Sequence, residues 1–395
     1  MTFLASSLRR LRKLTALAVL GVSFASTPAL AADLGSMIPS PPSLAAKAWV
    51  LMDAKSGRIL VENNADERVP PASLTKMMTA YIAEYEMDQG NLAPDDQVRI
   101  SENAWRTGGS RMFLRVGTYA SVNDLMQGIV IQSGNDASVA MSEHIAGSED
   151  AFAQLMNQHA KMMGLKNTHF MNPTGLPNPD HYSSAHDLAI IARHIIEDYP
   201  SHYKLYSEKY FTYNDIRQPN RNLLLWRDKT VDGLKTGHTE EAGYCLVASA
   251  KQEDTRLIAV VLGTNSEEAR AQETQKLLSY GFRYYKSQKL YDKGAVLNEA
   301  RVWGGAQNQV KLGVDHEVYL TVSSQNDDQL AARMNVQQNL EAPIEAGKQY
   351  GTLQVVQGDE VIHEEPLVAL EAVEQGGFFK RIWDSVQRFV YSLFE

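Results

Sequence analysis

The sequence has one cysteine, Cys245, among 395 residues, so no internal disulfide and no cage of several thiolates around a metal can form. Glycine (26 residues) and proline (14) are too sparse for a collagen-like or low-complexity chain. With 44% hydrophobic residues, the chain has enough apolar material for two ordinary domains. Its formal net charge of -9 argues against nucleic acid as a partner, because phosphate contacts require clustered cations.

The N-terminal segment lacks acidic residues up to Asp33. A basic stretch, Arg9–Lys13, precedes an apolar run, Leu14–Phe24, which is short for a membrane span. Ala29–Ala31 then provides a small-residue cleavage site. We expect residues 1–31 to be a signal peptide that directs export from the cytoplasm, the alternative being an N-terminal anchor helix.

The C-terminal segment, residues 376–395, has the periodicity of an amphipathic helix. One face collects Phe378, Phe379, Ile382, Trp383, Val386, Phe389, Val390, Leu393 and Phe394. The helix has too many charges to cross a bilayer, and its aromatic face suits a position in the plane of the membrane surface. We expect a peripheral anchor, with Gly376-Gly377 as a hinge; the alternative is a helix packed on the protein's own core.

Between these ends the hydrophobic pattern changes at about residue 290. The earlier part is helical in pattern from about 121 to 200 and contains strand-like segments at Trp49–Met52, Ile59–Val61, Cys245–Ala250 and Leu257–Leu262. We expect an α+β domain over residues 44–287, an antiparallel sheet flanked by helices. Short apolar stretches between turns predict a small all-β domain over residues 290–374, more typical of a spacer or platform than of a second enzyme.

The first motif with chemical potential is Ser73-x-x-Lys76, where a helical pattern begins. A spacing of three residues at a helix start brings the hydroxyl and the amine onto one face. A desolvated lysine can take the proton of a serine and so create a nucleophile. The pattern alone is weak, because Ser201-x-x-Lys204 also matches it, beside Pro200 in a polar stretch.

The second motif is Ser133-x-Asn135, whose hydroxyl and amide could relay protons and hold a substrate carbonyl. It is also weak alone, since Ser101-x-Asn103 and Ser324-x-Asn326 match it equally well. Ser101 is better explained as the N-cap of a helix.

The third motif, Lys235-Thr236-Gly237, occurs once in the sequence. Its glycine would let a ligand backbone approach a strand edge closely. The three motifs follow one another at intervals of about 60 and 100 residues, within one predicted domain. In this order they resemble the active-site set of the penicillin-recognising serine enzymes, the penicillin-binding proteins and serine β-lactamases.

The resemblance narrows to the low-molecular-mass D-alanyl-D-alanine carboxypeptidases of the penicillin-binding protein 5 and 6 type. The matching segments are Ser133–Ala140, Gly164–Phe170, Asn220–Asn222 with Leu224–Trp226, and Asp232–Ala250. The similarity covers essentially the whole chain, including the signal, the β-rich second domain and the amphipathic end. It implies a penicillin-binding-protein-like α+β fold and a periplasmic enzyme held peripherally on the outer face of the inner membrane.

The resemblance also implies a substrate and a mechanism. The enzyme would remove the terminal D-alanine from peptidoglycan stem peptides through an acyl-enzyme, and β-lactams would inhibit it covalently. Ser73 would be the nucleophile and Lys76 the general base, while Ser133 would bridge Lys76 and Lys235 and pass the proton to the leaving D-alanine amine. Asn135 would hold the peptide amide. No metal or other cofactor is expected.

Substrate binding would involve the strand of the third motif and an arginine. The backbone N–H groups of Ser73 and His238 would stabilise the oxyanion, and Gly237 would lie beside the substrate. Thr236 and an arginine would bind the terminal carboxylate, because a guanidinium grips a carboxylate with two hydrogen bonds. Arg221 is the first choice for this arginine and Arg270 the second.

Other functions remain alternatives at this point. A D-alanyl-D-alanine endopeptidase and a catalytically silent wall- or membrane-binding protein are both compatible with the pattern. A β-lactamase is disfavoured, because residues 172–184 lack the glutamate that would position a deacylating water. A metallohydrolase is disfavoured too, because the ten histidines form no H-E-x-x-H or comparable spacing.

Overall fold

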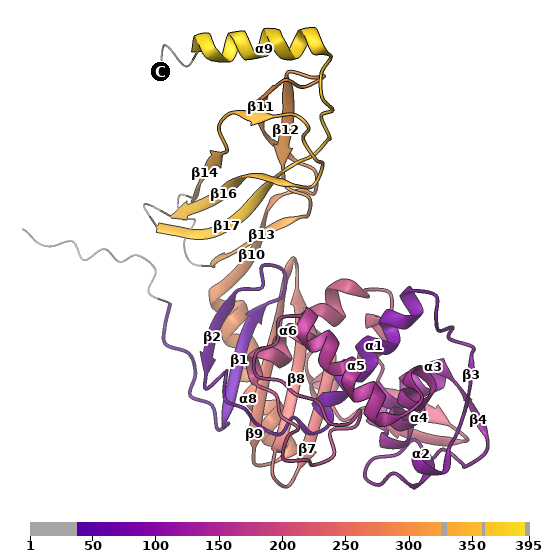
Figure 1. The fold of residues 1–395 in the computed structure, drawn as a ribbon. Helices are drawn as coiled ribbons and strands as arrows, with labels where there is room; N and C mark the ends of the chain where they lie inside the picture. The colour runs from indigo at the N-terminus through magenta and orange to yellow at the C-terminus, as the bar shows by residue number, and fades with distance from the viewer. Residues whose placement is uncertain (1–37, 325–329, 358–359, 392–395) are drawn as a thin grey trace, which may run out of the picture. The chain divides into compact units, whose positions relative to one another are not determined.

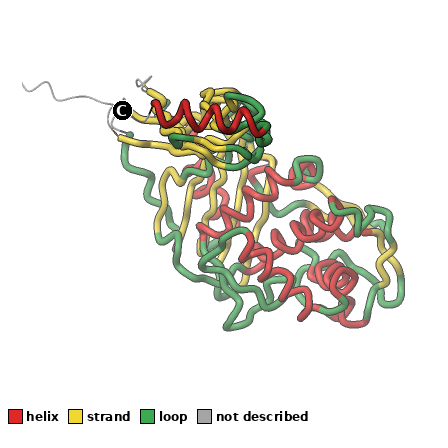
Figure 2. The backbone as a smooth tube through the Cα atoms, turned by 45° about the horizontal axis from the view of Figure 1, so that its top comes forward, coloured by secondary structure: helices red, strands yellow, loops and turns green. Residues whose placement is uncertain are grey.

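The structure is a computed structural model that describes residues 38–324, 330–357 and 360–391. Figure 1 follows the chain from indigo to yellow, and Figure 2 shows how helices and strands are distributed along it. Up to residue 284 a sheet is combined with many helices, whereas the later part is rich in strands until the final helix α9 (Phe378–Tyr391). The predicted signal peptide, residues 1–31, lies outside the described residues.

A five-stranded antiparallel sheet lies at the centre of the first part. Its strands are, in spatial order, β2 (Ile59–Asn63), β1 (Ala48–Asp53), β9 (Thr255–Thr264), β8 (Gly243–Gln252) and β7 (Val231–Thr239). The four strand-like segments that the sequence predicted correspond to β1, β2, β8 and β9 and are confirmed. The sheet also pairs β1 with β9, which joins the two ends of this part of the chain.

Alternate residues of the central strands belong to two separate hydrophobic cores. Val50 and Val260 pack with the helical layer on one face, whereas Leu51 and Val261 pack with helix α8 (Glu267–Tyr284) on the other. Because both faces are covered, β1 is buried along its whole length. A slip of one residue would exchange the two faces of the strand, so this packing specifies the strand register.

The helical layer and its connections contain most of the remaining elements. They are η1 (Ala72–Thr75), α1 (Lys76–Asp88), α2 (Glu102–Arg106), α3 (Val122–Gln127), η2 (Gly128–Gln132), α4 (Asn135–Ala146), α5 (Glu149–Met162), α6 (Ala185–Asp198), η3 (Tyr203–Ser207) and α7 (Leu224–Arg227), with the strand pairs β3 (Gln97–Arg99) and β4 (Tyr119–Ser121), and β5 (Tyr210–Tyr213) and β6 (Ile216–Pro219). Ser101 caps α2, since its hydroxyl accepts a hydrogen bond from the N–H of Ala104 at 2.9 Å. The N-cap prediction is therefore confirmed.

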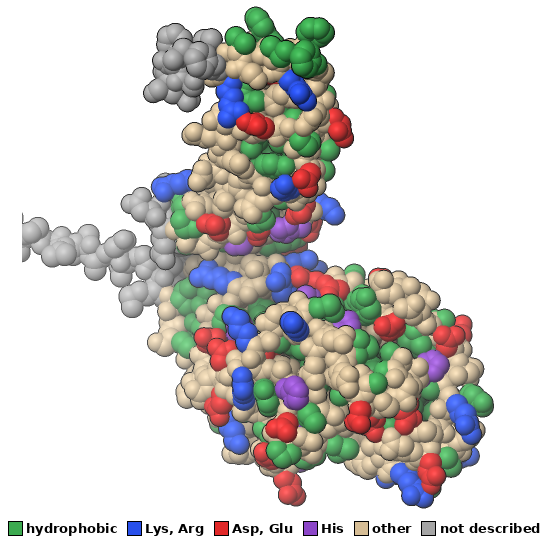
Figure 3. Space-filling view, viewed as in Figure 1, with side chains coloured by type: hydrophobic (Ala, Val, Ile, Leu, Met, Phe, Trp, Pro, Cys, Tyr) green, Lys and Arg blue, Asp and Glu red, His purple; other side chains and the backbone are tan. Residues whose placement is uncertain are grey.

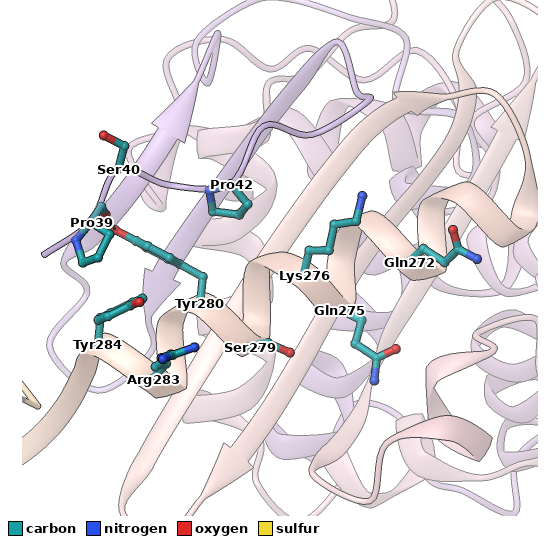
Figure 4. A pocket seen from close by; sticks show the side chains of 10 residues that line it. All are labelled: Pro39, Ser40, Pro42, Gln272, Gln275, Lys276, Ser279, Tyr280, Arg283 and Tyr284. Carbon is teal, nitrogen blue, oxygen red and sulfur yellow. Dashed lines mark hydrogen bonds between the residues drawn. The ribbon is translucent and has the colours of Figure 1, made fainter.

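Helix α8 borders a groove of about 610 Å³ together with the segment 39–42 (Figure 4). The hydroxyl of Tyr280 donates a hydrogen bond to the carbonyl oxygen of Pro39 at 2.8 Å, which ties this proline-rich segment to the helix. The other side chains drawn in Figure 4 include Gln272, Gln275 and Lys276. None of the three sequence motifs contributes to this groove.

The C-terminal part is an all-β region followed by helix α9. Strand β10 (Tyr285–Tyr291) pairs with β13 (Val318–Ser323), and a six-stranded sheet has the order β14 (Leu330–Val336), β16 (Gln349–Gln357), β17 (Glu360–Ala369), β12 (Gln309–Gly313), β11 (Val296–Trp303) and β15 (Leu340–Glu341). This region has cores of its own, one of them built around Val302, Leu312 and Ile344. The α+β class with an all-β region and a final helix agrees with the sequence-based prediction.

Helix α1 contains an acidic residue, Glu84, that is completely buried. One carboxyl oxygen accepts a hydrogen bond from the Tyr206 hydroxyl at 3.2 Å, and the other has no hydrogen-bond partner among the described residues. Burial raises the pKa of Glu84 to about 8, although the hydrogen bond from Tyr206 opposes this. Glu84 is therefore protonated at neutral pH in the folded protein and ionised in the unfolded chain.

We expect Glu84→Gln to stabilise the protein at pH 8. The folded state holds a proton on Glu84 up to about pH 8, while the unfolded chain loses it near the ordinary value of 4.5, so stability falls as pH rises between these values. A neutral glutamine removes this loss, and the expected gain at pH 8 is roughly 2–4 kcal/mol, measured by urea denaturation. The exposed Asp88→Asn on the same helix is the control; an unchanged pH dependence in Glu84→Gln would contradict the assignment.

Candidate active site

The three sequence motifs come together in space although they lie on different elements. Ser73 is in the 3-10 turn η1 and Lys76 is the first residue of α1. Ser133 links η2 to α4, and Asn135 begins α4. Lys235 lies in β7, at the edge of the central sheet.

The amine of Lys76 is at the centre of the site. Its Nζ lies 3.1 Å from the Ser73 Oγ, 2.7 Å from the Asn135 Oδ1 and 2.6 Å from the Thr174 carbonyl oxygen. The two carbonyl oxygens can only accept hydrogen bonds, whereas the serine hydroxyl can also donate one. When Lys76 is neutral, its two N–H bonds therefore satisfy Asn135 and Thr174, and its lone pair faces the Ser73 hydroxyl.

The electrostatics of the site favour that neutral form. Lys76 is only 1% exposed, and burial, followed by the positive charge of Arg221, lowers its pKa to about 7. The carboxylate of Asp136 acts in the opposite direction but is the weaker influence. A lysine with this pKa is half deprotonated at neutral pH, which is the state a general base requires.

Lys235 is the second buried amine of the cleft. Its Nζ lies 2.9 Å from the Ser133 Oγ and 3.0 Å from the Thr236 carbonyl oxygen. Burial, and then the nearby charge of Lys76, hold its pKa well below the ordinary value for lysine. Ser133 therefore lies beside Lys235, and among the described residues no direct hydrogen bond joins Ser133 to Lys76.

The backbone around Ser133 is unusual. The π-helical turn η2 ends at Ser133, which has φ of 64° in the left-handed region that a residue with a side chain rarely adopts. The carboxylate of Asp136 accepts hydrogen bonds from the N–H groups of Met112 and Leu114 at 3.0 and 3.1 Å, which holds the neighbouring loop against α4. The amide of Asn135 donates to the Gly108 carbonyl oxygen at 2.7 Å. Asn135 is thus tied both to this loop and to Lys76.

Strand β7 passes close to the turn that carries Ser73. A Cβ atom on Gly237 would lie 3.0 Å from the Pro71 carbonyl oxygen and 3.3 Å from the Leu74 nitrogen. A Cβ atom at position 237 would be crowded in this approach of β7 to η1, and glycine avoids the crowding. The approach brings the backbone of β7 next to the nucleophile turn.

The two candidate arginines occupy different environments. Arg270 is 2% exposed, and its guanidinium lies 3.5 Å from the Gly237 carbonyl oxygen and 3.3 Å from the Arg221 carbonyl oxygen. Its guanidinium also lies 5.7 Å from the ring of Tyr244, which stacks on His238 with ring centroids 4.0 Å apart. Arg221 is exposed, and its charge lowers the pKa of both buried lysines. Both arginines therefore lie near the cleft, Arg270 behind β7 and Arg221 toward solvent.

Sequence reasoning missed the contribution of the loop 171–181. Besides the Thr174 carbonyl oxygen on Lys76, this loop places His181, which is 4% exposed, with its Nε2 2.9 Å from the Thr75 hydroxyl. The Nδ1 of His181 accepts from the Met171 N–H at 3.3 Å, and burial lowers its pKa to about 4, so the ring is neutral. No spacing pattern links His181 to Thr75 in the sequence, because the partners are 106 residues apart.

Gly175 explains how this loop comes so close to the nucleophile turn. It has φ of 81°, and a Cβ atom there would lie 1.8 Å from the Ala72 carbonyl oxygen. The side chain of Asn172 accepts from the N–H groups of Thr174 and Gly175 at 3.1 and 2.8 Å. The loop is therefore held in the shape that presents the Thr174 carbonyl oxygen to Lys76.

The competing S-x-x-K match does not form such a site. Ser201 and Lys204 are both exposed, and Lys204 lies in the short helix η3.

Among the described residues, no group of three or more histidine, cysteine and acidic side chains could hold a metal ion.

A serine hydroxyl beside a buried amine, with a strand edge next to both, is the arrangement of the serine acyl-transfer enzymes. A family model described as D-alanyl-D-alanine carboxypeptidase matches residues 36–266, and one described as the C-terminal domain of penicillin-binding protein 5 matches residues 285–375. The chain belongs to the D-alanyl-D-alanine carboxypeptidase family. Its activity is that of a D-alanyl-D-alanine carboxypeptidase, as the resemblance predicted.

Individual relatives are similar over most of their length. The D-alanyl-D-alanine carboxypeptidase DacA of Escherichia coli (strain K12) is 42% identical over 98% of this chain and 97% of its own. The crystal structure of penicillin-binding protein 5 from Haemophilus influenzae has 43% sequence identity, covers 85% of this chain and 100% of its own, and gives a TM-score of 0.80. Penicillin-binding protein D2 of Listeria monocytogenes, solved in an ampicillin-bound form, is 30% identical over 62% of this chain and 100% of its own, with a TM-score of 0.57.

Proposed function

We propose that this protein removes the terminal D-alanine from peptidoglycan stem pentapeptides through an acyl-enzyme on Ser73. The observation that carries the proposal is the arrangement around Lys76, whose lone pair faces the Ser73 hydroxyl when the amine is neutral. Deprotonated by Lys76, the Ser73 oxygen attacks the carbonyl between the two D-alanines. The tetrahedral intermediate then collapses, the D-alanine amine leaves with a proton, and water hydrolyses the ester.

The proton for the leaving amine reaches it through Ser133. Its hydroxyl is 2.9 Å from the Lys235 Nζ, and the charge of Lys76 helps to lower the pKa of Lys235. The backbone N–H groups of Ser73 and His238 stabilise the oxyanion, each such donor typically contributing about 10²–10³ in rate. Asn135, Thr236 and Gly237 line the path of the substrate.

The carboxylate of the leaving D-alanine is bound on the β7 side of the cleft, by Thr236 and a cation. Arg221 is exposed and therefore available for a bidentate contact, whereas Arg270 is buried and already bonded to backbone carbonyl oxygens. Arg221 is thus the proposed ligand and Arg270 the support of its segment. The ampicillin-bound relative supports covalent inhibition of this chain by β-lactams at the same serine.

The exposed side chains of helix α9 support a position of the enzyme on a membrane surface. Phe379 and Trp383 are 86% and 63% exposed, and Figure 3 shows the hydrophobic side chains of α9 in green on the molecular surface. In the described part of the chain, no helix has both the length and the hydrophobicity to span a bilayer. A helix whose aromatic side chains face outward suits the lipid interface. We therefore place the mature protein in the periplasm, bound to the outer face of the inner membrane after removal of residues 1–31.

The domain division follows the same proposal. Residues 44–287 form the catalytic domain, residues 290–374 the all-β domain, and residues 376–395 the membrane anchor. The ranges of the two family matches and the separate hydrophobic cores support this division.

We expect Ser73→Ala to abolish both D-alanine release and covalent labelling by a fluorescent penicillin. The reason is that no other hydroxyl lies against the Lys76 amine among the described residues. Release is measured on a pentapeptide, and the labelled site is mapped by mass spectrometry. Ser201→Ala, at the competing motif, is the control and should keep full activity; residual label in Ser73→Ala would show that the nucleophile is another residue.

We expect activity to fall about tenfold per pH unit below pH 7, because protonated Lys76 cannot act as a base. Since the charge of Arg221 lowers the pKa of Lys76, Arg221→Gln should move this acidic limb of the kcat profile to higher pH. Arg217→Gln is a matched control. The guanidinium carbon of Arg217 lies 3.8 Å from the centroid of the Tyr210 ring, and Arg217 is not among the charges that shift the pKa of Lys76. An acidic limb that stays in place in Arg221→Gln would contradict the electrostatic coupling.

Deletion of residues 376–395 should release the protein from membranes while kcat/KM on a small peptide stays unchanged. The deletion removes the exposed aromatic face but no residue of the cleft. Membrane fractionation and peptide assays measure the two properties separately. Membrane association that survives the deletion would refute the anchor.

A further inference from the structure

The polar side of helix α9 is bound to the C-terminal β region. Asp384 is 5% exposed, and its Oδ2 accepts a hydrogen bond from the Gly304 N–H at 2.9 Å. The Lys380 amine lies 3.2 Å from the same oxygen and also donates to the Asn308 Oδ1. A buried carboxylate is therefore satisfied by a backbone donor that follows strand β11 and by a lysine one turn earlier in its own helix.

The contact continues along the helix. An Nη2 of Arg301 in β11 donates to the Gln387 side-chain oxygen at 2.8 Å. Arg388 forms an ion pair with Glu341 of β15. The bonded positions 380, 384, 387 and 388 follow the spacing of a single helix face, opposite to the exposed Phe379, Ile382 and Trp383.

The segment that leads into α9, at Gly376, also contacts the β region. The Gly376 N–H donates to the Gly304 carbonyl oxygen at 2.9 Å, and a Cβ atom on Gly376 would lie 2.7 Å from the Gly305 carbonyl oxygen. The sequence indicated a hinge at Gly376-Gly377, and for Gly376 this is wrong, because close packing and a backbone hydrogen bond hold it. Gly304 thus binds the helix through its N–H and the segment before the helix through its carbonyl oxygen.

We propose that Asp384 and Gly304 form a latch that holds the anchor helix rigidly on the all-β domain. The latch fixes the position of α9 on the all-β domain. This domain therefore has one orientation on a lipid surface and does not move on a flexible linker. The inference rests on the proposed membrane anchoring and specifies how it works. Two of the cations of α9, Lys380 and Arg388, are paired with acids of the protein, so insertion of aromatic side chains is the main attraction to the bilayer.

Hydrogen exchange tests the latch itself in the full-length protein. In Asp384→Ala the Gly304 N–H loses its acceptor, and we expect its exchange to accelerate at least tenfold. Asp384→Asn keeps an acceptor oxygen and should restore most of the protection. Ser385→Ala, a change at the adjacent exposed position, should have no effect; equal exchange in Asp384→Ala and in the parent protein would overturn the latch.

Fluorescence anisotropy tests whether the latch gives the all-β domain a fixed orientation on a membrane. A fluorophore is attached to Met334→Cys, an exposed position in β14, and the buried Cys245 stays unlabelled. On vesicles of phosphatidylethanolamine and phosphatidylglycerol (3:1), the parent should show a high residual anisotropy that falls at least twofold in Asp384→Ala and persists in Ser385→Ala. Equal anisotropy in the vesicle-bound parent protein and in vesicle-bound Asp384→Ala would overturn the rigid attachment of α9.

The same experiment separates the failure of the latch from the failure of the anchor. If the parent does not sediment with vesicles while Ser73 still reacts with penicillin, the membrane anchor is refuted and the carboxypeptidase assignment stands. If the parent forms dimers through α9 in solution and these exclude vesicles, a second copy is the partner of the aromatic face and the lipid assignment is wrong.

Discussion

The buried amines of Lys76 and Lys235 set a requirement that the surrounding structure has to meet. Removing a charged amine from water is costly, and two like charges in one cleft increase the cost. Both amines therefore bind protons less readily than an exposed lysine does. The structure accommodates them with oxygen acceptors from several elements, namely Ser133, Asn135, and the carbonyl oxygens of Thr174 and Thr236. Burial in these surroundings also leaves the amine of Lys76 partly unprotonated at neutral pH.

This requirement explains why the backbone near the cleft departs from ordinary geometry. Ser133 adopts a left-handed conformation, and Gly175 brings its loop closer to the turn that carries Ser73 than a Cβ atom would permit. Gly237 avoids crowding where β7 approaches the same turn. Such positions persist only where the surrounding packing holds them. Here the two hydrophobic cores on either side of the sheet supply that packing. The rigidity of the domain thus serves the placement of a few oxygen atoms around one amine.

Helix α9 is oriented in the opposite way to an ordinary amphipathic terminal helix, which packs its apolar face on the protein. The polar residues of α9 contact the protein, whereas its aromatic residues are exposed. This arrangement is unfavourable in water, since exposed aromatic area is costly, and becomes favourable only when another apolar phase covers it. The cleft around Lys76 and the exposed aromatic face of α9 therefore lie on different parts of the chain.

Much of this could be predicted from the sequence, because the motifs are local. Ser73 and Lys76 share a helix turn, the strands near residue 250 alternate clearly, and the amphipathic period of the C-terminal helix is independent of its surroundings. The competing match at Ser201 could be set aside from its polar context beside Pro200 and from the order of the three motifs along the chain. The sequence ranked Arg221 before Arg270 as the carboxylate ligand, and this ranking stays a prediction. The structure adds that Arg221 is exposed whereas Arg270 is buried and bonded to backbone carbonyl oxygens, and neither property is written in a spacing pattern.

Tertiary structure alone decided the remaining features, since each joins residues distant in sequence. The Thr174 carbonyl oxygen reaches Lys76 across 98 positions, and the contact of His181 with Thr75 spans 106. Backbone carbonyl oxygens leave no signature in the amino-acid sequence, because every residue has one. The contact of the polar face of α9 with the β region likewise depends on Gly304, which lies 80 residues before Asp384. The sequence by itself determined which chemical groups the protein contains and which local structures they favour; folding decided which of them meet, because only close packing brings separate segments within hydrogen-bond distance.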